Sequence, residues 1–346
     1  MKKLRLAIIG AGQITNVTHI PNFKNMEEVE VVAVCDTNSN AAEDLAKKEA
    51  IPNWFGDYNI MLETVKPDAV LICVPNKFHC RITLDALEAG CHVYCEKPPA
   101  ISVAEAKSME MKAKEKGLIL TYGFHMRHSE AVSLIREKIV RNEFGTIYAS
   151  KVQWLRRRGI PGWGNFTNKE LQGGGPLIDL GVHLLDIALY LLDYPEISYV
   201  CANANYSLGK IAKAGLMGQW DRNKFNVEDS LFGYIQFKNG SNLNLETSFA
   251  LNMKEKDIRN INLFGDKLGA SLFPLQVFGE DAGMVTDQYF PFVDMDNCHM
   301  KCTKNFVDAC LKKEDLLIKT EQGTYIQKIV SAMYASAESG MPELFK

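Results

Sequence analysis

The hydrophobic positions of the first 120 or so residues fall into short continuous runs, and amphipathic segments lie between these runs. The runs predict β-strands at 4–9, 29–35, 69–74, 92–95 and 118–122. The segments between them predict helices at 14–25, 40–48, 57–65, 78–89 and 103–116. Continuous apolar strands that alternate with helices are typical of a parallel sheet with helices on both faces. We therefore expect an α/β domain in residues 1–123.

The pattern changes after residue 123, where strands with alternating apolar and polar positions become common. The clearest signal is a hairpin, with strands at 230–237 and 242–249 around the turn sequence Lys238-Asn239-Gly240-Ser241. Further elements are a strand at 147–155 and helices at 129–141, 176–192, 301–312 and 321–338. They predict a second domain, residues 124–346, of α+β class with a large, mostly antiparallel open sheet. We also consider that the final helix packs back on the first domain.

Composition is that of a globular protein and gives no signal for nucleic acid or membrane partners. Hydrophobic residues make up 47% of the chain and charged residues 23%, and the net charge is −3. No apolar run reaches the roughly 20 residues that span a bilayer. The nine cysteines form no disulfide framework, which favours reduced thiols in a cytoplasm. The spacings Cys91-x-x-x-Cys95 and Cys298-His299-x-x-Cys302 are too weak to predict a metal site.

A glycine turn between the first strand and its helix suggests a dinucleotide site. In Gly10-Ala11-Gly12-Gln13-Ile14-Thr15, two glycines allow a tight turn and close approach to a pyrophosphate at a helix N-terminus. Thr15 replaces the third glycine of the usual Rossmann fingerprint. Asp36 ends the second strand, where an acid would bind the ribose hydroxyls. The alternative is an ordinary glycine turn beside a strand-end aspartate.

Asp36 also bears on the choice of nucleotide. A carboxylate at this position repels a 2′-phosphate, and Thr37-Asn38-Ser39 supplies no arginine to offset it. We therefore expect NAD rather than NADP.

Asp179 and His183 are spaced i, i+4 on the helix that follows Gly173-Gly174-Gly175-Pro176, so their side chains share one face. One interpretation is an exposed ion pair. The other is a polar cluster that faces a cleft, because the rest of this helix is strongly apolar. The residues alone leave both open.

With these motifs in place, the chain resembles the Gfo/Idh/MocA (glucose–fructose oxidoreductase/inositol dehydrogenase) oxidoreductases almost from end to end. The shared motifs include the opening glycine turn, Val74-Pro75-Asn76 with His79, Glu96-Lys97-Pro98, Gly123-Phe124-His125-Met126-Arg127, Gly174-Gly175-x-x-x-Asp179-x-x-x-His183, and Tyr334-x-Ser336-Ala337. The resemblance implies a Rossmann domain followed by a domain whose open sheet often forms an oligomer interface. We therefore expect a homodimer or homotetramer.

The resemblance also implies roles for individual residues. The catalytic set would be Lys97, Asp179 and His183. The expected nucleotide contacts come from Gly10, Gly12, Gln13, Ile14, Asp36, Thr37, Pro75, Asn76, His79, Glu96 and Lys97. The expected substrate contacts come from Arg127, Arg158, Trp163, Asp179 and His183. For His79, a simple capping role is the alternative.

The predicted reaction is hydride transfer between NAD and a secondary alcohol of a sugar, sugar derivative or cyclic polyol. A histidine is suited to accept the hydroxyl proton, and a lysine can stabilise the developing alkoxide or share the role of base. Three alternatives stay open: an NAD-retaining glycoside hydrolase or an aldose oxidoreductase that acts through transient oxidation, and a nucleotide-responsive module without catalysis. The third is disfavoured because a sensor has no need of Lys97, Asp179 and His183 together.

The two prolines after Lys97 restrict the backbone that carries it. Lys97 follows a short strand, and ligands bind at the carboxyl ends of the strands in open α/β sheets. Pro98 and Pro99 fix their own φ angles and bias the preceding residues away from helix. The direction of the lysine is therefore constrained. Neither the isomer of the Lys97–Pro98 bond nor the consequence of Pro99 can be derived from the sequence.

Overall fold

The computed structural model describes residues 3–293 and 296–345. These residues form two compact units. Unit 1 comprises Met1–His125 with Asn297–Gln327, and unit 2 comprises Met126–Asp296 with Lys328–Lys346. The boundary between the units falls once near His125 and once within the long helix α11 (Thr320–Ser339).

Unit 1 is built on a six-stranded sheet in the part of the chain described. Its strands are β1 (Leu4–Ile9), β2 (Val29–Cys35), β3 (Trp54–Phe55), β4 (Ala69–Ile72), β5 (His92–Cys95) and β6 (Leu120–Tyr122). The spatial order is β3-β2-β1-β4-β5-β6, and every pair is parallel. Connections therefore run in opposite directions from β1 and β4, and such a switch point is where open α/β sheets bind ligands.

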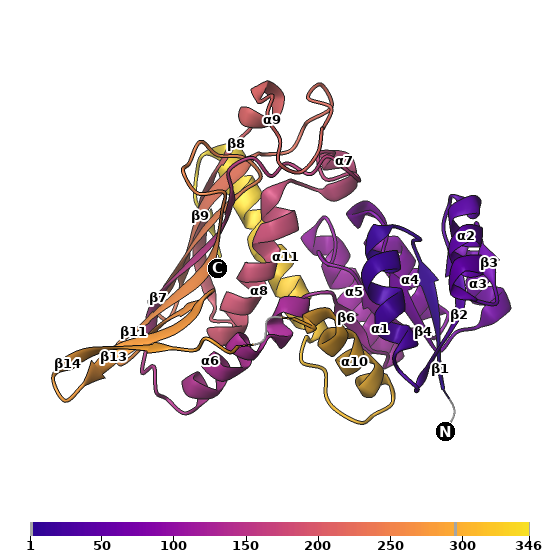
Figure 1. The fold of residues 1–346 in the computed structure, drawn as a ribbon, viewed down its shortest axis with the longest axis horizontal. Coiled ribbons are helices and arrows are strands. Elements are labelled where there is room, and N and C mark those ends of the chain that lie inside the picture. Colours follow the sequence, from indigo (N-terminus) through magenta and orange to yellow (C-terminus); the bar gives the residue numbers. More distant parts are fainter. Residues whose placement is uncertain (1–2, 294–295, 346) are drawn as a thin grey trace. The chain divides into compact units, whose positions relative to one another are not determined.

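Helices fill the connections of this sheet (Figure 1). They are α1 (Ile20–Lys24), α2 (Ser39–Glu49), α3 (Tyr58–Val65), α4 (His79–Glu88) and α5 (Val103–Lys116), and α10 (Cys298–Cys310), from later in the chain, also belongs to unit 1. Three of them begin at side chains that accept backbone N–H bonds: Asn38, Asp57 and Ser102. The predicted parallel α/β fold is confirmed. The short strand β3 was missed because two residues carry no periodic signal.

Unit 2 is built on a nine-stranded sheet among its described residues. The strands are β7 (Ile147–Arg156), β8 (Ile197–Asn205), β9 (Ser230–Phe237), β10 (Asn242–Ser248), β11 (Asp257–Gly265), β12 (Gly269–Leu272), β13 (Leu275–Asp281), β14 (Met284–Tyr289) and β15 (Glu343–Leu344). Their order is β14-β13-β12-β11-β7-β10-β9-β8-β15. Only the β7–β10 pair is parallel in this described sheet. The predicted mostly antiparallel sheet is confirmed.

The helices of unit 2 are α6 (Glu130–Val140), α7 (Lys169–Gln172), α8 (Val182–Leu191) and α9 (Leu208–Ile211). Helix α8 packs on β7 and β11, which explains why most of its residues are apolar. By length and composition, Lys169–Leu191 could cross a membrane, but 89% of its apolar 18-residue window is buried inside the protein. Such burial is typical of a core helix.

Two π-helical turns, Thr15–His19 and Leu177–Gly181, interrupt the helices predicted at 14–25 and 176–192. The first turn follows the glycine turn of unit 1 and continues into α1. The second carries Asp179 and continues into α8, which begins at Val182. Single π-turns inside helices occur frequently at functional sites. Both turns coincide with segments for which the sequence predicts function.

Candidate active site

The glycine turn after β1 leaves space beside its backbone. Gly10 has a φ of +105°, and a Cβ at this residue would lie 2.1 Å from the carbonyl oxygen of Cys73, so only glycine fits. A Cβ at Gly12, in contrast, would meet no atom within 4 Å. Gly12, Gln13 and Ile14 are exposed. Packing within the protein therefore does not require glycine at position 12. A ligand that approaches the backbone closely would require it.

Thr15 explains the departure from the usual third glycine. Its side chain is buried, and its Oγ1 donates a hydrogen bond of 2.7 Å to the Gly10 carbonyl. Thr15 thus closes the turn by a side-chain hydrogen bond where other chains pack a glycine. The turn keeps its shape without the complete fingerprint.

Asp36 is held by the backbone at both carboxylate oxygens. Ala11 N donates to Oδ2 and Asn38 N donates to Oδ1, each at 2.8 Å. Each oxygen accepts only one of these bonds and has a lone pair left. The carboxylate is therefore fixed beside the glycine turn and can still accept ribose hydroxyls, while Thr37 next to it is exposed. These features fit a bound dinucleotide.

His79 is enclosed by backbone carbonyls. Its Nδ1 lies 2.8 Å from Pro98 O and its Nε2 lies 2.9 Å from Val74 O, and the ring is fully buried. Burial lowers the pKa of His79 below its usual value. The arrangement favours a structural role, in which His79 ties the end of β4 to the segment that carries Lys97, over the predicted contact with the cofactor. Pro75 and the nearly buried Asn76 begin the short 3₁₀ turn before it.

Glu96 joins a buried histidine to the backbone of Lys97. Its Oε1 lies 2.7 Å from Nε2 of His19, and its Oε2 accepts a 3.1 Å hydrogen bond from Lys97 N. Gly123 permits this position, because a Cβ there would lie 2.6 Å from Oε2. No motif in the sequence marks this pair, because His19 and Glu96 lie 77 positions apart.

The environment of Glu96 keeps its carboxyl ionised. Burial alone would raise its pKa, but the hydrogen bond from His19 and the charges of His19, His299 and Lys97 lower it to about 2. This value lies below the ordinary 4.5, so the carboxylate contributes stability at neutral pH. That contribution is lost as the pH falls through the range from 4.5 to about 2.

Two further histidines complete this cluster in unit 1. The rings of His125 and His299 stack with centroids 3.4 Å apart, and His299 meets the His19 ring edge-on at 6.2 Å. Burial, and then the neighbouring His299, lowers the pKa of His125 to about 3. Within residues 3–293 and 296–345, no group of three or more His, Cys, Asp or Glu side chains is arranged to hold a metal ion.

Lys97 is half-buried at the carboxyl end of β5. The Lys97–Pro98 bond is cis. Pro98 and Pro99 are buried, and a Cβ at Gly323 of α11 would lie 3.0 Å from Pro99 Cγ. Pro99 therefore packs against α11 within unit 1. This packing is the effect of the second proline, which could not be derived from the sequence.

In unit 2, the glycines before Asp179 make room for a buried carboxylate and a tyrosine. A Cβ at Gly174 would lie 1.9 Å from Tyr334 Oη. Glu228, which is 1% exposed, accepts hydrogen bonds from Gly175 N (2.9 Å), Leu177 N (3.2 Å) and the Tyr334 hydroxyl (2.8 Å). Glu228 thus satisfies the amides at the start of the helix and fixes the turn that carries Asp179.

Glu228 had no signal in the sequence, because it lies 53 residues from Gly175. Burial raises its pKa, and the Tyr334 and backbone hydrogen bonds oppose that change. Two residues of the Tyr334-x-Ser336-Ala337 motif form hydrogen bonds that hold α11 in unit 2. Tyr334 bonds to Glu228, as described above. Ser336 accepts a hydrogen bond from Ala202 N at 3.0 Å, which fixes α11 to β8.

His183 lies beside an aromatic and basic group on β7. Its ring centroid is 6.0 Å from that of Trp154, and the Arg156 guanidinium lies over the Trp154 ring at 5.7 Å. Burial lowers the pKa of Arg156, and the charges of Asp179 and Asp257 oppose this effect. Trp154 and Arg156 therefore belong to the surroundings of Asp179 and His183. The strand predicted at 147–155 ends one residue early, because Arg156 still belongs to β7.

Arg127 is buried in an ion pair and not at a surface. Its Nε donates to Asp186 Oδ2 at 3.1 Å, and Nη2 donates to Asp186 Oδ1 and to the Tyr194 hydroxyl. Arg127 is 1% exposed and lies over the Tyr190 ring at 4.9 Å. This arrangement favours a structural role for Arg127 over the predicted contact with substrate.

The other two predicted substrate residues lie in loops. Arg158 donates from Nη1 to Leu251 O at 2.8 Å and from Nη2 to Asn252, so its guanidinium secures the loop after β10. Trp163 is 46% exposed between Gly162 and Gly164. The structure places Lys97 and the nucleotide residues in unit 1, and Asp179, His183, Arg158 and Trp163 in unit 2.

Comparison with known families agrees with this division of the chain. Residues 4–124 match the model described as "Oxidoreductase family, NAD-binding Rossmann fold", and residues 136–343 match "Oxidoreductase family, C-terminal alpha/beta domain". The chain belongs to the Gfo/Idh/MocA oxidoreductase family. It is therefore an enzyme, and the predicted oxidoreductase class and NAD-binding Rossmann fold are confirmed.

Individual relatives of this family member are sugar and polyol dehydrogenases. The chain is 44% identical to D-glucoside 3-dehydrogenase of Escherichia coli (strain K12) over 337 residues, 97% of this chain and 96% of the relative. It is 30% identical to scyllo-inositol 2-dehydrogenase (NAD(+)) of Bacillus subtilis (strain 168), over 71% of this chain and 67% of the relative. Levoglucosan dehydrogenase in complex with NADH has the same fold, with a TM-score of 0.85, 20% identity, and all of both chains covered.

Proposed function

We propose that this Gfo/Idh/MocA oxidoreductase uses NAD to oxidise the hydroxyl at carbon 3 of a D-glucoside. The observation that carries the proposal is the 44% identity to a D-glucoside 3-dehydrogenase over nearly the whole of both chains. The inositol dehydrogenase relative supports the broader class, oxidation of a secondary alcohol on a six-membered ring. The backbone-anchored Asp36 and the open space beside Gly12 support NAD as the oxidant.

Lys97, Asp179 and His183 are the residues that we propose carry the reaction. NAD, when bound, supplies the acceptor for the hydride that leaves the substrate carbon. The hydroxyl must lose its proton in the same step, and a side chain of suitable basicity accepts it. His183 takes that proton in our proposal, Asp179 orients the histidine and the substrate, and Lys97 stabilises the negative charge that develops on oxygen.

The assay that tests this function follows NADH absorbance with purified protein, NAD and methyl β-D-glucopyranoside. We expect NADH to form in proportion to a 3-keto glucoside that nuclear magnetic resonance identifies. A ketone at another carbon would refute the position, and no turnover of any glucoside or inositol would refute the substrate class. Release of methanol without net NADH would instead identify the enzyme as an NAD-retaining glycoside hydrolase.

Replacement of Asp36 by serine tests the choice of nucleotide. We expect D36S to raise the ratio of kcat/KM with NADP to kcat/KM with NAD at least about tenfold, because the carboxylate no longer repels a 2′-phosphate. Serine can still accept one of the two backbone hydrogen bonds that anchor Asp36. Steady-state kinetics with both nucleotides measure the ratio.

Asp44 lies on the exposed side of α2 and gives the control variant D44S, which should keep the wild-type ratio. An unchanged ratio in D36S would show that another group selects the nucleotide. Wild-type turnover that is faster with NADP than with NAD would contradict the inference from Asp36 directly.

Cytoplasmic location and a homodimer or homotetramer stay predictions from the free thiols and the family resemblance. On the sheet of unit 2, Tyr148, Phe232 and Phe264 are large exposed hydrophobic side chains, which supports a covered surface in an oligomer. Light scattering of the purified protein measures the mass against the 38.8 kDa of one chain. A mass of one chain would contradict the proposed oligomer.

A further inference from the structure

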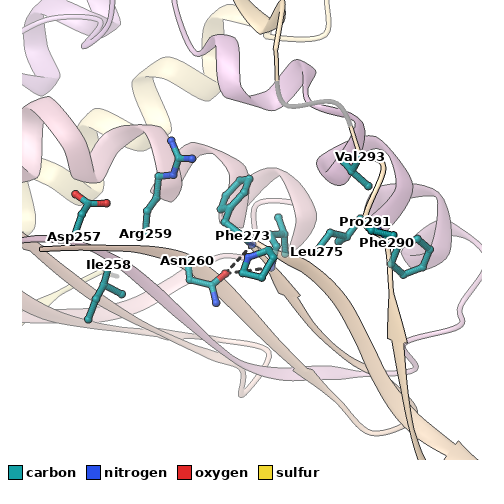
Figure 2. Close-up of a pocket in the computed structure, with 11 residues that line it drawn as sticks. Asp257, Ile258, Arg259, Asn260, Phe273, Leu275, Phe290, Pro291 and Val293 are labelled. Carbon is teal, nitrogen blue, oxygen red and sulfur yellow. Dashed lines mark hydrogen bonds between the residues drawn. The ribbon is translucent and has the colours of Figure 1, made fainter. Parts of the chain in front are cut away.

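A groove of about 650 Å³ in unit 2 has no assigned role. It lies along the first residues of β11, beside the turn between β12 and β13 and the segment that follows β14 (Figure 2). In the described part of the chain β11 pairs with β12 from Asn262 to Phe264, and the same edge of its first residues carries no strand there. The Asn260 side chain accepts hydrogen bonds from Leu272 N and Phe273 N and holds the turn at the end of this edge.

Arg259 stands in the groove with its hydrogen-bond donors available. Figure 2 shows its side chain rising from β11 on the same side as Asp257 and Phe273. The guanidinium lies 5.6 Å from the Trp154 ring and 5.4 Å from the Phe273 ring, so two aromatic contacts hold it. Among the residues that the structure describes, it makes no hydrogen bond or ion pair. An arginine held in this way can present its planar donor fork to a carboxylate or phosphate.

The charge of the neighbouring Asp257 is partly offset. Its Oδ1 lies 3.9 Å from Nε of Arg156, which faces it across the β7–β11 pair. Arg259 has no such partner in the described part of the chain. An anion in the groove can therefore pair with Arg259 without displacing a carboxylate of the described chain.

Apolar rings and prolines form the rest of the lining. Phe273, Pro274, Phe290 and Pro291 supply flat apolar surface at the end of the groove near the β12–β13 turn. A pyranose can stack its C–H face on such a wall, but it has no acidic group to pair with Arg259. An aromatic ring that carries an acidic group matches both the wall and Arg259.

The groove begins one side chain away from the proposed catalytic histidine. Trp154 neighbours both residues: its ring centroid lies 6.0 Å from that of His183 and 5.6 Å from the Arg259 guanidinium. A substrate whose sugar lies at His183 would therefore extend past Trp154 into the groove. A glucoside carries its aglycone on the same ring as the hydroxyl that is oxidised, so the aglycone is the part that can reach Arg259.

We infer that this groove is an aglycone subsite, and that it selects D-glucosides whose aglycone is an aromatic ring with a carboxylate or other acidic group. The inference rests on the proposed glucoside oxidation and adds the class of aglycone. Trp154 separates the sugar from the aglycone, Arg259 binds the acidic group, and Phe273 and Phe290 contact the ring.

The test compares three substrates with the wild-type enzyme and the R259Q variant: phenyl β-D-glucoside, 4-carboxyphenyl β-D-glucoside and glucose 6-phosphate. We expect wild type to prefer the carboxyphenyl over the phenyl glucoside in kcat/KM, and R259Q to lower that preference about tenfold through KM. R259K keeps the charge but not the fork and should retain more of the preference than R259Q. R141Q, at an exposed arginine of the same unit, should keep the wild-type preference.

Two results would overturn the inference: an equal effect of R259Q on both glucosides, or a loss confined to glucose 6-phosphate. Calorimetric titration with the carboxyphenyl glucoside separates this inference from the proposed oxidation. If wild type oxidises no glucoside but binds this compound about tenfold more tightly than R259Q does, the proposed reaction fails and the subsite stands. Equal affinities of wild type and R259Q refute the subsite whatever the turnover.

Discussion

Replacement of Lys97 by methionine, or of His183 by alanine, is expected to lower kcat at least about 100-fold, while NAD still binds. The magnitude follows from the contribution of a positioned acid or base, roughly 10²- to 10⁴-fold. Methionine keeps the length and apolar stem of the lysine but cannot stabilise an alkoxide. The glycine turn and Asp36, which we expect to hold most of the nucleotide, are unchanged in both variants. Steady-state kinetics measure kcat, and calorimetry measures NAD affinity.

The pH dependence of kcat/KM separates the roles of the two residues. A variant that lacks the base loses the acidic limb of the profile, whereas a variant that lacks only the alkoxide stabiliser keeps it. We expect H183A to lose this limb and K97M to retain it. The opposite result would make Lys97 the base.

An exposed lysine gives the control for Lys97. Lys107 on α5 pairs with Glu110 at the surface, and K107M should leave kcat within about twofold of wild type, as surface substitutions usually do. Near-normal turnover of K97M or H183A would remove that residue from the proposed mechanism. A parallel loss of NAD affinity would make it a cofactor-binding residue first.

The surroundings of Lys97 make its position sensitive to residues far along the chain. Glu96 accepts the Lys97 backbone N–H, His19 holds Glu96, and His79 contacts the carbonyl of Pro98. These three side chains lie in three different segments of unit 1. The family resemblance implies nucleotide contacts from His79 and Glu96, and the structure gives both side chains contacts that fix the Lys97 segment.

The helices and strands of unit 1 were predicted well because signals within each segment mark where it begins and ends. Continuous apolar runs gave the strands, and residues such as Gly90 and Gly117, both with positive φ, mark helix ends. The π-helical turns at Thr15 and Leu177 could not be predicted, because the apolar spacing around them also fits an α-helix. The parallel pairing of β7 with β10 was equally hidden, since it joins strands some 90 residues apart.

The candidate site was predictable only where a motif is local. Gly10 and Gly12 lie in the turn after β1 and Asp36 follows β2, so all three belong to the first βαβ unit, and their geometry agrees with the expected nucleotide site. Trp154, Arg259 and Glu228 depend on pairings between distant strands or between a strand and a helix start. Residue type alone cannot assign such partners. For the same reason Arg127 looked like a ligand of substrate in the sequence and lies in a buried pair in the structure.

Removal of one partner from that buried pair is expected to destabilise the protein severely. Arg127 and Asp186 both have side chains with 0% exposure. D186A leaves the guanidinium buried and without its carboxylate, which costs about 3–5 kcal/mol in comparable pairs. Unfolding in urea, followed by tryptophan fluorescence, measures the loss, because Trp154, Trp163 and Trp220 report on unit 2 and Trp54 alone on unit 1.

Two further variants separate the buried pair from a role in substrate binding. D193N removes the exposed carboxylate that pairs with Arg136 near the same Tyr190 ring, and it should cost no more than about 1 kcal/mol. The double variant R127M/D186L removes both buried charges and should regain most of the stability that D186A loses, because no uncompensated charge remains. If D186A instead keeps wild-type stability and raises KM for the glucoside, Arg127 acts on substrate as the sequence predicted. A severe loss of stability in D186A, with recovery in the double variant, would show that this arginine serves the fold of unit 2.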